Sequence, residues 1–185
     1  MSLDESARIF DGIRVLDIPY FSDQRGIFSK IMSFEAMKVQ NIDLQIMQIN
    51  HSFTSEIGSI RGMHLQKSPY AEKKLITCIR GAVFDVALDL RKDSKTFLNY
   101  FSIELNARSK RSVLIPEGFA HGFQVLKKDT EMLYVHSQEY KVEYEEGFNP
   151  LDPAFDIKWP LVTGLISKKD SLHEMVGKNF QGLEL

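Results

Sequence analysis

Two histidines stand out among the residues whose side chains could do chemistry. His64 lies in "GSIRGMHLQ", and His121 lies in "IPEGFAHGF". Both segments have the composition of β-strands, so each could supply half of a metal site. Alternatively, a lone histidine could act as a Brønsted base, because the ordinary pKa of histidine, about 6.5, lies close to working pH. The pattern around each histidine decides between these two uses.

The spacing of the possible ligands argues against a metal. Cupin barrels, which these segments resemble, hold a metal through two histidines one residue apart, a later glutamate and a further histidine in a second motif. Here Gln66 stands two residues after His64, and the order around Glu72 is not that of a ligand. Two imidazoles without a clear third ligand are too few for a catalytic zinc site. We therefore expect no metal and no cofactor.

Short strands are predicted to position these residues. Runs of alternating or β-branched residues follow one another from about residue 12 to residue 140, mostly separated by Gly, Pro, Asn or Asp. Many short strands at regular spacing predict an antiparallel sandwich or barrel. Helices are expected only at "FEAMKVQN" and, near the end, at "KKDSLHEMVGK". Because we find no linker and no repeat, residues 1–185 are expected to form a single all-β domain.

Alternation along three predicted strands places polar side chains on faces that otherwise look buried. The strands are "KKLITCIR", "AVFDVALDL" and "EMLYVHSQEY". The polar members of these faces are Lys74, Asp85, Tyr134 and His136. The lumen of a small barrel offers a place for such groups, and a lumen of mixed polarity is typical of a small-molecule site.

Composition excludes several classes of partner. The formal charge of −2 gives no basic surface for nucleic acid. No apolar stretch reaches the roughly 20 residues of a membrane span, and the start "MSLDESARIF" does not read as a secretory signal. We therefore expect a cytoplasmic protein that binds neither nucleic acid nor membrane. The single cysteine, Cys78, excludes an internal disulfide and is interpreted as a small buried apolar residue.

Five segments together are more specific than any one of them: "DQRGIFSK", "QINHSFTSEIGSIRGMHLQ", "KKLITCIRGAVFDVALDLRKDSKTF", "IPEGFAHGF" and "DPAFDIKWP". In this order, from about Asp23 to Asp170, they resemble the dTDP-4-dehydrorhamnose 3,5-epimerase family. The resemblance implies a cupin-like jelly-roll β-barrel with a few short peripheral helices, a homodimer, and no metal. It also implies a nucleoside-diphosphate 4-keto-6-deoxy sugar as substrate, a dTDP-sugar in the first place.

The chemistry of such an epimerase suits the catalytic residues that the resemblance implies. A carbon next to a ketone loses a proton when the resulting enolate is stabilised, and epimerisation needs a base on one face and an acid on the other. By resemblance, His64 is the base, Asp170 is the carboxylate that orients it, Lys74 faces the enolate oxygen and Tyr134 is the acid. A carboxylate beside a histidine stabilises the imidazolium that forms.

The resemblance also implies a set of residues around the nucleotide sugar. Arginines suit the diphosphate because they are always charged and bind oxygens in a bidentate manner. Tyr140 and Phe28 are candidates to stack on the base, Phe28 from the other subunit. His121 is expected near the diphosphate. The full substrate-binding set is Arg25, Phe28, Gln48, Asn50, Arg61, His121, Tyr140, Glu145 and Lys169.

Several assignments have alternatives. Asp85 rivals Asp170 as the partner of a histidine, and Lys73 is the neighbour of Lys74, although alternation puts the two lysines on opposite faces. Tyr134 could be a core residue with a satisfied hydroxyl. Other residues are interpreted as having no catalytic role. His136 and His173 are interpreted as surface or loop residues, and Trp159 as a packing anchor. The charged segment "KVEYEEG" is interpreted as a solvated loop from which only Glu145 reaches the site.

One residue departs from the family pattern. Lys30 stands where the family usually has glutamate, which leaves the identity of the nucleotide and the sugar open. Three other functions therefore remain: epimerisation of C3 only or C5 only in a related sugar, non-catalytic binding of a sugar nucleotide, and a metal-dependent cupin reaction. Retention of both His64 and Tyr134 favours the epimerase.

Overall fold

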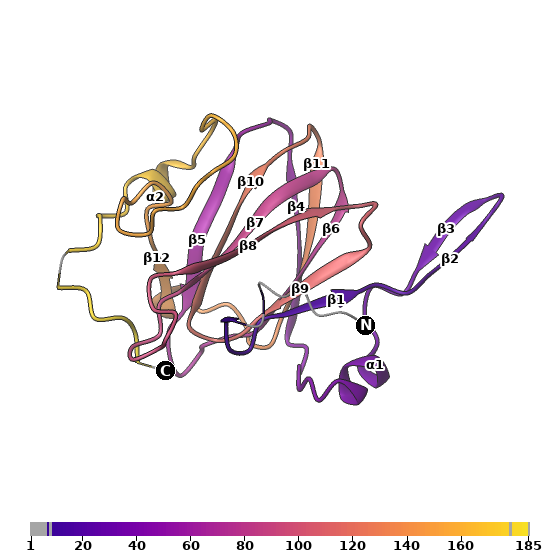
Figure 1. Ribbon diagram of the computed structural model, residues 1–185, viewed down its shortest axis with the longest axis horizontal. Helices are drawn as coiled ribbons and strands as arrows, with labels where there is room; N and C mark the ends of the chain where they lie inside the picture. The colour runs from indigo at the N-terminus through magenta and orange to yellow at the C-terminus, as the bar shows by residue number, and fades with distance from the viewer. Residues whose placement is uncertain (1–6, 8, 178, 185) are drawn as a thin grey trace.

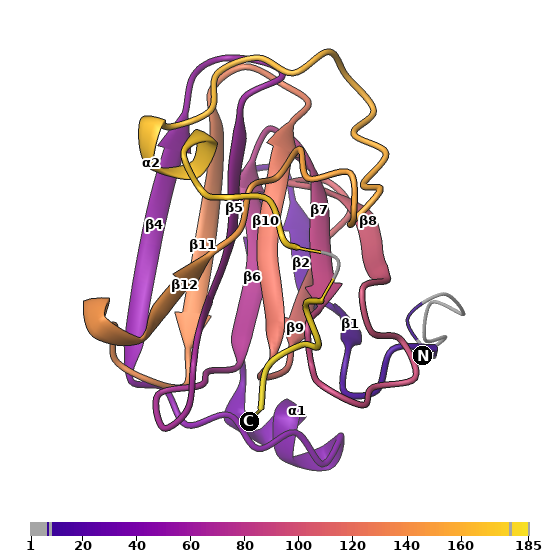
Figure 2. The same cartoon turned by 90° about the vertical axis from the view of Figure 1, so that its left-hand side faces the viewer.

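The computed structural model describes residues 7, 9–177 and 179–184 of the 185-residue chain. Two five-stranded antiparallel sheets face each other (Figures 1 and 2). A separate two-stranded hairpin projects from them (Figure 1). This architecture confirms the predicted all-β class. The first sheet has the order β1 (Arg14–Asp17), β9 (Arg111–Ile115), β6 (Lys74–Arg80), β11 (Thr130–His136), β4 (Gln48–Thr54). The second has the order β12 (Glu145–Gly147), β5 (Ile60–Gln66), β10 (Phe119–Val125), β7 (Ala82–Asp89), β8 (Tyr100–Asn106).

The inner faces of the two sheets form the main core. Successive side chains of a strand point to opposite faces, so alternate apolar residues of each sheet meet between the sheets. Ile76 and Cys78 of β6 pack there against Val83 and Ala87 of β7, as alternation predicts. Burial raises the pKa of the Cys78 thiol to about 11. The interpretation of Cys78 as a buried apolar residue is therefore confirmed.

Each sheet is also covered on its outer face. The short helix α1 (Phe34–Val39), capped by Ser33, places Met37 against the outer side chains of the first sheet. The segment after β12 packs on the outer face of the second sheet. Trp159 lies there against Phe84 of β7, and its indole N–H donates a hydrogen bond to the Pro150 carbonyl at 2.8 Å. The interpretation of Trp159 as a packing anchor is confirmed.

The hairpin of β2 (Tyr20–Asp23) and β3 (Gly26–Ser29) stands away from the two sheets (Figure 1). Its apolar side chains face solvent: Phe21 is 73% exposed, Ile27 57% and Phe28 74%. Arg25, at its turn, is bonded only to the neighbouring carboxylate of Asp23 among the described residues. An apolar hairpin of this kind is uncovered within one chain. Along the described part of the chain, no helix has the length and apolar character needed to cross a membrane.

We expect Asp89→Asn to lower the unfolding free energy by about 3 kcal/mol at neutral pH, because a buried charge network loses one partner. The Asp89 carboxylate is fully buried and accepts hydrogen bonds from Arg91, Ser94 and Thr96 at 2.6–2.9 Å. Burial alone would raise the pKa of Asp89, but these hydrogen bonds outweigh burial and lower the pKa.

The lowered pKa gives this prediction its pH dependence. Stability from the Asp89 carboxylate is present above its ordinary pKa of 3.8 and is lost as the pH falls through the lower native pKa. The difference between wild type and Asp89→Asn, measured by urea unfolding at several pH values, should therefore shrink in acid. The matched control is Asp17→Asn, which removes an exposed ion pair with Arg111 and should change stability by less than about 1 kcal/mol. Equal effects of the two substitutions would contradict the prediction.

Candidate active site

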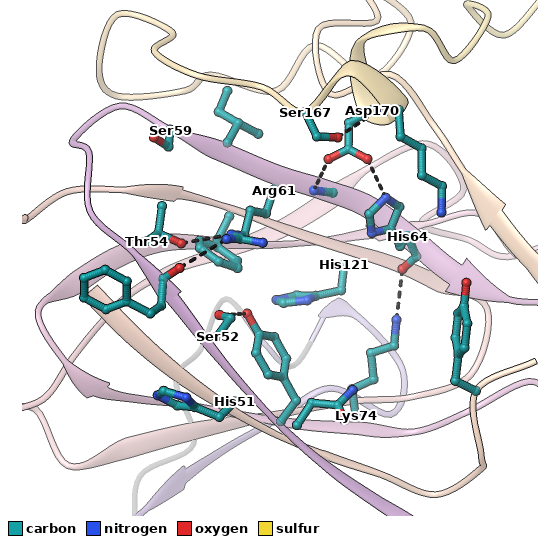
Figure 3. A pocket seen from close by; sticks show the side chains of 18 of the residues that line it. His51, Ser52, Thr54, Ser59, Arg61, His64, Lys74, His121, Ser167 and Asp170 are labelled. Carbon is teal, nitrogen blue, oxygen red and sulfur yellow. Dashed lines mark hydrogen bonds and ion pairs between the residues drawn. The ribbon is translucent and has the colours of Figure 1, made fainter. Parts of the chain in front are cut away.

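A pocket of about 920 Å³ opens between the two sheets, with walls from β4, β5, β6, β10 and β11 and a rim from the segment around α2 (Lys168–Ser171) (Figure 3). The structure brings most of the predicted site residues together here. Gln48 does not line the pocket but bonds Asn50, which does. Arg25 and Phe28 lie on the projecting hairpin, outside the pocket of their own chain. The predicted residues that line it are Asn50, Arg61, His64, Lys74, His121, Tyr134, Tyr140, Glu145, Lys169 and Asp170.

His64 is paired with Asp170, not with Asp85. His64 Nε2 lies 2.8 Å from Asp170 Oδ1, and the other carboxylate oxygen is 3.4 Å from the Gly62 backbone N–H. Ser167 caps α2 by accepting a hydrogen bond from the Asp170 backbone N–H, which fixes the turn that carries the carboxylate. Burial alone would raise the pKa of Asp170, but the hydrogen bond and charge of His64, together with the hydrogen bonds from Ser167 and Gly62, lower the pKa. The predicted helix "KKDSLHEMVGK" is shorter than expected and ends at Ser171.

His121 forms a second histidine–aspartate pair with the rival aspartate. His121 Nε2 lies 2.8 Å from Asp85 Oδ2, and both side chains are almost fully buried. His121 and His64 lie opposite each other in the antiparallel register of β10 and β5. His64 and His121 are therefore neighbours on paired strands, each bonded to its own carboxylate.

Lys74 points into the pocket, whereas Lys73 points out of it. Lys74 Nζ donates to the His64 carbonyl at 3.0 Å and lies 3.2 Å from Glu72 Oε1. Lys73 Nζ instead donates to the Asp43 carbonyl at the surface. Alternation along β6 thus selected the correct lysine. The Lys74 ammonium, 8% exposed, is a positive charge held inside the pocket.

Tyr134 lies across the pocket on β11 and keeps its proton. Its hydroxyl is 2.9 Å from Ser52 Oγ of the paired strand β4. Burial is the main cause that raises the pKa of Tyr134 well above its ordinary value. The hydroxyl is therefore a proton donor at neutral pH, at a position where its ring also packs against the core.

The exposed end of the pocket carries an aromatic ring, a carboxylate and a basic side chain that contact one another. Tyr140 is half exposed, and two hydrogen bonds hold it in place. Its backbone N–H donates to Gln48 Oε1 at 2.9 Å, and its hydroxyl donates to Glu145 Oε2 at 2.7 Å. Lys169 also donates to Glu145. The hydrogen bond to Glu145 raises the pKa of Tyr140 to about 12. Arg61 lies on the opposite side, held by Thr54 Oγ1 at 2.9 Å.

The prediction that "KVEYEEG" is a solvated loop was wrong. Val142–Tyr144 form a 3₁₀ turn, and Glu145–Gly147 form β12, which pairs with β5 at Gln66, Leu65 and His64. Only three residues of the segment pair, and all three are partly exposed. The segment therefore has no alternating apolar pattern from which a strand could be predicted. Glu145 does reach the pocket, as expected.

The prediction that His136 lies at the surface or in a loop was also wrong. His136 ends β11, its side chain is 12% exposed, and it lines the pocket. Alternation had already placed it on the face of Tyr134, so the sequence contained the signal. Its Nδ1 lies 3.0 Å from Glu72 Oε2. His173 does lie in a loop, half-buried after α2.

His173 adds a third side chain beside His64 and Asp170. Ligand atoms of His64, Asp170 and His173 all lie within 4.8 Å of one another. Because His64 Nε2 and Asp170 Oδ1 lie 2.8 Å apart in a hydrogen bond, a cation between these two atoms would have to replace the proton that they share. A histidine hydrogen-bonded to a carboxylate is an arrangement that can carry out general acid–base catalysis.

Known proteins share this sequence and this fold. The dTDP-4-dehydrorhamnose 3,5-epimerase family matches residues 8–177. The dTDP-4-dehydrorhamnose 3,5-epimerase of Sinorhizobium fredii is 40% identical over 152 residues, which cover 82% of this chain and 78% of the relative. The enzyme of that name from Bacillus anthracis, solved with TDP and PPi bound, aligns with a TM-score of 0.88 at 33% identity, covering 95% of this chain and 100% of that chain.

A further solved structure carries a sugar nucleotide. It is the dTDP-6-deoxy-D-glucose-3,5-epimerase of Legionella pneumophila in complex with dTDP-4-keto-L-rhamnose, with a TM-score of 0.86 at 31% identity over 95% of each chain. These neighbours have a cupin-like fold, which confirms the predicted jelly-roll class. Given the family match over residues 8–177 and the identity to named enzymes, the chain belongs to the dTDP-4-dehydrorhamnose 3,5-epimerase family of carbohydrate epimerases.

Proposed function

We propose that this enzyme epimerises C3 and C5 of a dTDP-4-keto-6-deoxy sugar, in the biosynthesis of a deoxysugar such as dTDP-rhamnose. One observation carries the proposal: a histidine–aspartate pair, a buried ammonium and a protonated tyrosine converge on one pocket. These are the base, the oxyanion stabiliser and the acid that proton exchange next to a ketone requires.

In the proposed mechanism His64 removes the proton from the carbon next to the C4 ketone. Its Nε2 is engaged by Asp170, which leaves Nδ1 as the nitrogen that takes the proton. The Asp170 carboxylate stabilises the imidazolium that forms. Lys74 stabilises negative charge on the ketone oxygen as the enolate develops. Tyr134 then donates its proton to the opposite face of the same carbon.

The substrate's nucleotide end is proposed to lie at the exposed mouth of the pocket. Arg61 and Lys169 supply positive charge for the diphosphate, and Tyr140 presents a half-exposed ring on which the base can stack. Asn50 lines the pocket wall, and Gln48 bonds Asn50 without lining the pocket itself. Relatives solved with TDP or a dTDP-sugar support this class of ligand. His121 and Glu145 complete the proposed binding set.

We also propose a homodimer in which the projecting hairpin meets the second subunit. Phe28 and Arg25 would then contribute to a pocket that is not their own, which explains why an apolar hairpin lies uncovered in one chain. Lys30 directly follows this hairpin, so its charge would meet the partner's substrate. Residues 1–185 are proposed to form one domain, because both sheets share one core. The cytoplasmic location stays a prediction.

Light scattering after size-exclusion chromatography tests the dimer. The expected mass is twice the chain mass of 21.3 kDa. Phe28→Asp, on the hairpin, is expected to lower that mass to one chain. Its control is Phe34→Asp, which changes a 64% exposed phenylalanine at the start of α1. A wild-type protein that elutes as a clean monomer would contradict the proposal.

The function itself is tested by proton NMR of dTDP-4-keto-6-deoxyglucose with the enzyme in deuterium oxide. Deuterium at both C3 and C5 is the expected result. Incorporation at one carbon would make the enzyme a single-site epimerase. Binding of the sugar nucleotide with no incorporation, across a panel of keto sugars, would instead establish a non-catalytic binding protein. Metal analysis of the purified protein tests the metal-dependent alternative, which requires about one metal per chain.

A further inference from the structure

A third histidine–carboxylate pair lines the pocket and has no part in the mechanism above. His136 Nδ1 lies 3.0 Å from Glu72 Oε2, and the side chains are 12% and 7% exposed. The His136 ring stacks on the Tyr134 ring, with 6.2 Å between centroids and 23° between planes. The pair therefore touches the proposed acid directly. Burying a carboxylate is costly, so this one needs a compensating set of contacts.

Glu72 connects His136 to Lys74. One carboxylate oxygen, Oε1, lies 3.2 Å from Lys74 Nζ. The other, Oε2, accepts from His136 and, at 3.2 Å, from the side-chain amide of Gln66. Burial alone would raise the pKa of Glu72, but the His136 hydrogen bond and the Lys74 charge outweigh burial and lower it. Glu72 is thus a charged partner that holds the Lys74 ammonium where it donates to the His64 carbonyl.

His136 continues the connection toward the nucleotide end. With its Nδ1–H donated to Glu72, a neutral His136 has Nε2 as an acceptor, and Asn50 Nδ2 lies 3.4 Å from it. Asn50 Oδ1 in turn accepts from Gln48 Nε2 at 2.8 Å. Gln48 Oε1 accepts from the Tyr140 backbone N–H. Each donor in this row is hydrogen-bonded to an acceptor. This pairing fixes the orientation of the side-chain amides of Asn50 and Gln48.

Together these contacts form one continuous row along the pocket wall. It begins at Tyr140, where the nucleotide is proposed to stack, and ends at Lys74, which faces the ketone oxygen in the proposed mechanism. Asn50 and Tyr134 are directly opposite in the register of β4 and β11, and Gln48 is opposite His136. The antiparallel sheet therefore holds the row at a fixed spacing.

We propose that Glu72 and His136 are positioning residues that couple the nucleotide end of the pocket to Lys74. This inference rests on the proposed function, because the proposed function places Lys74 beside the ketone oxygen of the substrate. His136 orients the Asn50 amide and Glu72 orients the Lys74 ammonium, so contacts made by the nucleotide help to place the catalytic charge. Remote binding that favours the reacting geometry raises kcat as well as affinity.

The test compares three variants with wild type. His136→Phe keeps a ring to stack on Tyr134 but cannot donate to Glu72 or accept from Asn50. His136→Gln restores one donor and one acceptor. Glu72→Gln removes the charge that holds Lys74. The matched control is Glu131→Gln, which also removes a carboxylate bonded to a histidine, at the surface. For each protein, kcat and KM on dTDP-4-keto-6-deoxyglucose, the Kd for dTDP and the thermal midpoint are measured.

We expect His136→Phe to lower kcat about tenfold and to weaken dTDP binding about tenfold, with the Gln variant recovering most of both losses. Glu72→Gln is expected to lower kcat about tenfold while changing the Kd for dTDP less than His136→Phe does. Glu131→Gln should behave as wild type. Unchanged kcat and Kd in His136→Phe would overturn the inference, and so would losses that the Gln variant does not recover.

The two proposals can fail separately. If the wild-type enzyme shows no deuterium incorporation, the proposed function fails, while the Kd for dTDP still reports whether His136 organises the nucleotide end. If the wild type turns over normally and His136→Phe does too, the coupling fails and the function stands. A lowered thermal midpoint in His136→Phe, without recovery of kcat by the Gln variant, would assign His136 a structural role instead.

Discussion

His64→Gln is expected to lower the rate of proton exchange at C3 and C5 of the keto sugar by about 10³-fold. Glutamine can place its amide N–H near the position of His64 Nε2, which is the atom bonded to Asp170. It therefore keeps a donor for Asp170 and a volume close to that of histidine, so the pocket should retain its shape. It cannot accept the substrate proton, because its amide has no basic nitrogen. The loss of rate therefore measures the contribution of the base separately from that of the side-chain packing around His64.

Two measurements make this prediction specific to proton transfer. The incorporation of deuterium, followed by NMR, should fall at both carbons, whereas the Kd for dTDP should stay within about threefold of wild type because His64 is not one of the residues proposed to hold the nucleotide. Asp170→Asn should give a smaller loss, since it leaves the imidazole in place but removes the charge that orients it. If His64→Gln still exchanges protons at the wild-type rate, His64 is not the base.

Lys74→Met is expected to lower kcat by about 10²–10³-fold, the size of effect seen when one oxyanion donor is removed. Methionine preserves length and fills the same volume without a charge. KM should change little if the ammonium acts mainly on the developing enolate. The matched control is Lys73→Met on the same strand, whose ammonium bonds the Asp43 carbonyl outside the pocket and which should retain wild-type kcat.

Lys74→Met also leaves the buried Glu72 carboxylate without its counter-charge. The unfolding free energy should therefore fall by about 3 kcal/mol. A double variant, Lys74→Met with Glu72→Gln, removes the unpaired charge and should recover stability but not activity. Recovery of activity in the double variant would show that Lys74 serves only to balance Glu72, and would contradict its assignment to the enolate.

Strand alternation explains most of what could be predicted at this site. Because the side-chain period of a strand is two, the sequence alone selected Lys74 over Lys73 and put Asp85 and Tyr134 on the inner face. The structure agrees for all of them. In a long, regular strand, one residue known to face the core determines which face every other side chain of that strand takes.

Tertiary pairing explains what could not be predicted. Asp170 and Asp85 were rivals because α2 has four residues, too few for a periodic pattern to place it over the pocket. The histidine that pairs with Asp170 depends on where the C-terminal segment packs. The histidine that pairs with Asp85 depends on which strand lies beside β7. The sequence predicts a loop at β12 because three residues are too few to show alternation, and the extended form becomes evident only in the pairing with β5. His136 is a different case, because alternation indicates the correct face and contradicts its interpretation as a surface or loop residue.

The His64–Asp170 pair, proposed to be catalytic, joins residues 106 positions apart in the chain, and this separation sets an order of assembly. Every strand of the first sheet, as far as His136 at the end of β11, is synthesised before Asp170. Contacts between distant residues form slowly because loop closure costs entropy. A chain that is folding is therefore expected to gain its sheets first, and to become an active enzyme only when the tail docks and delivers the carboxylate to His64.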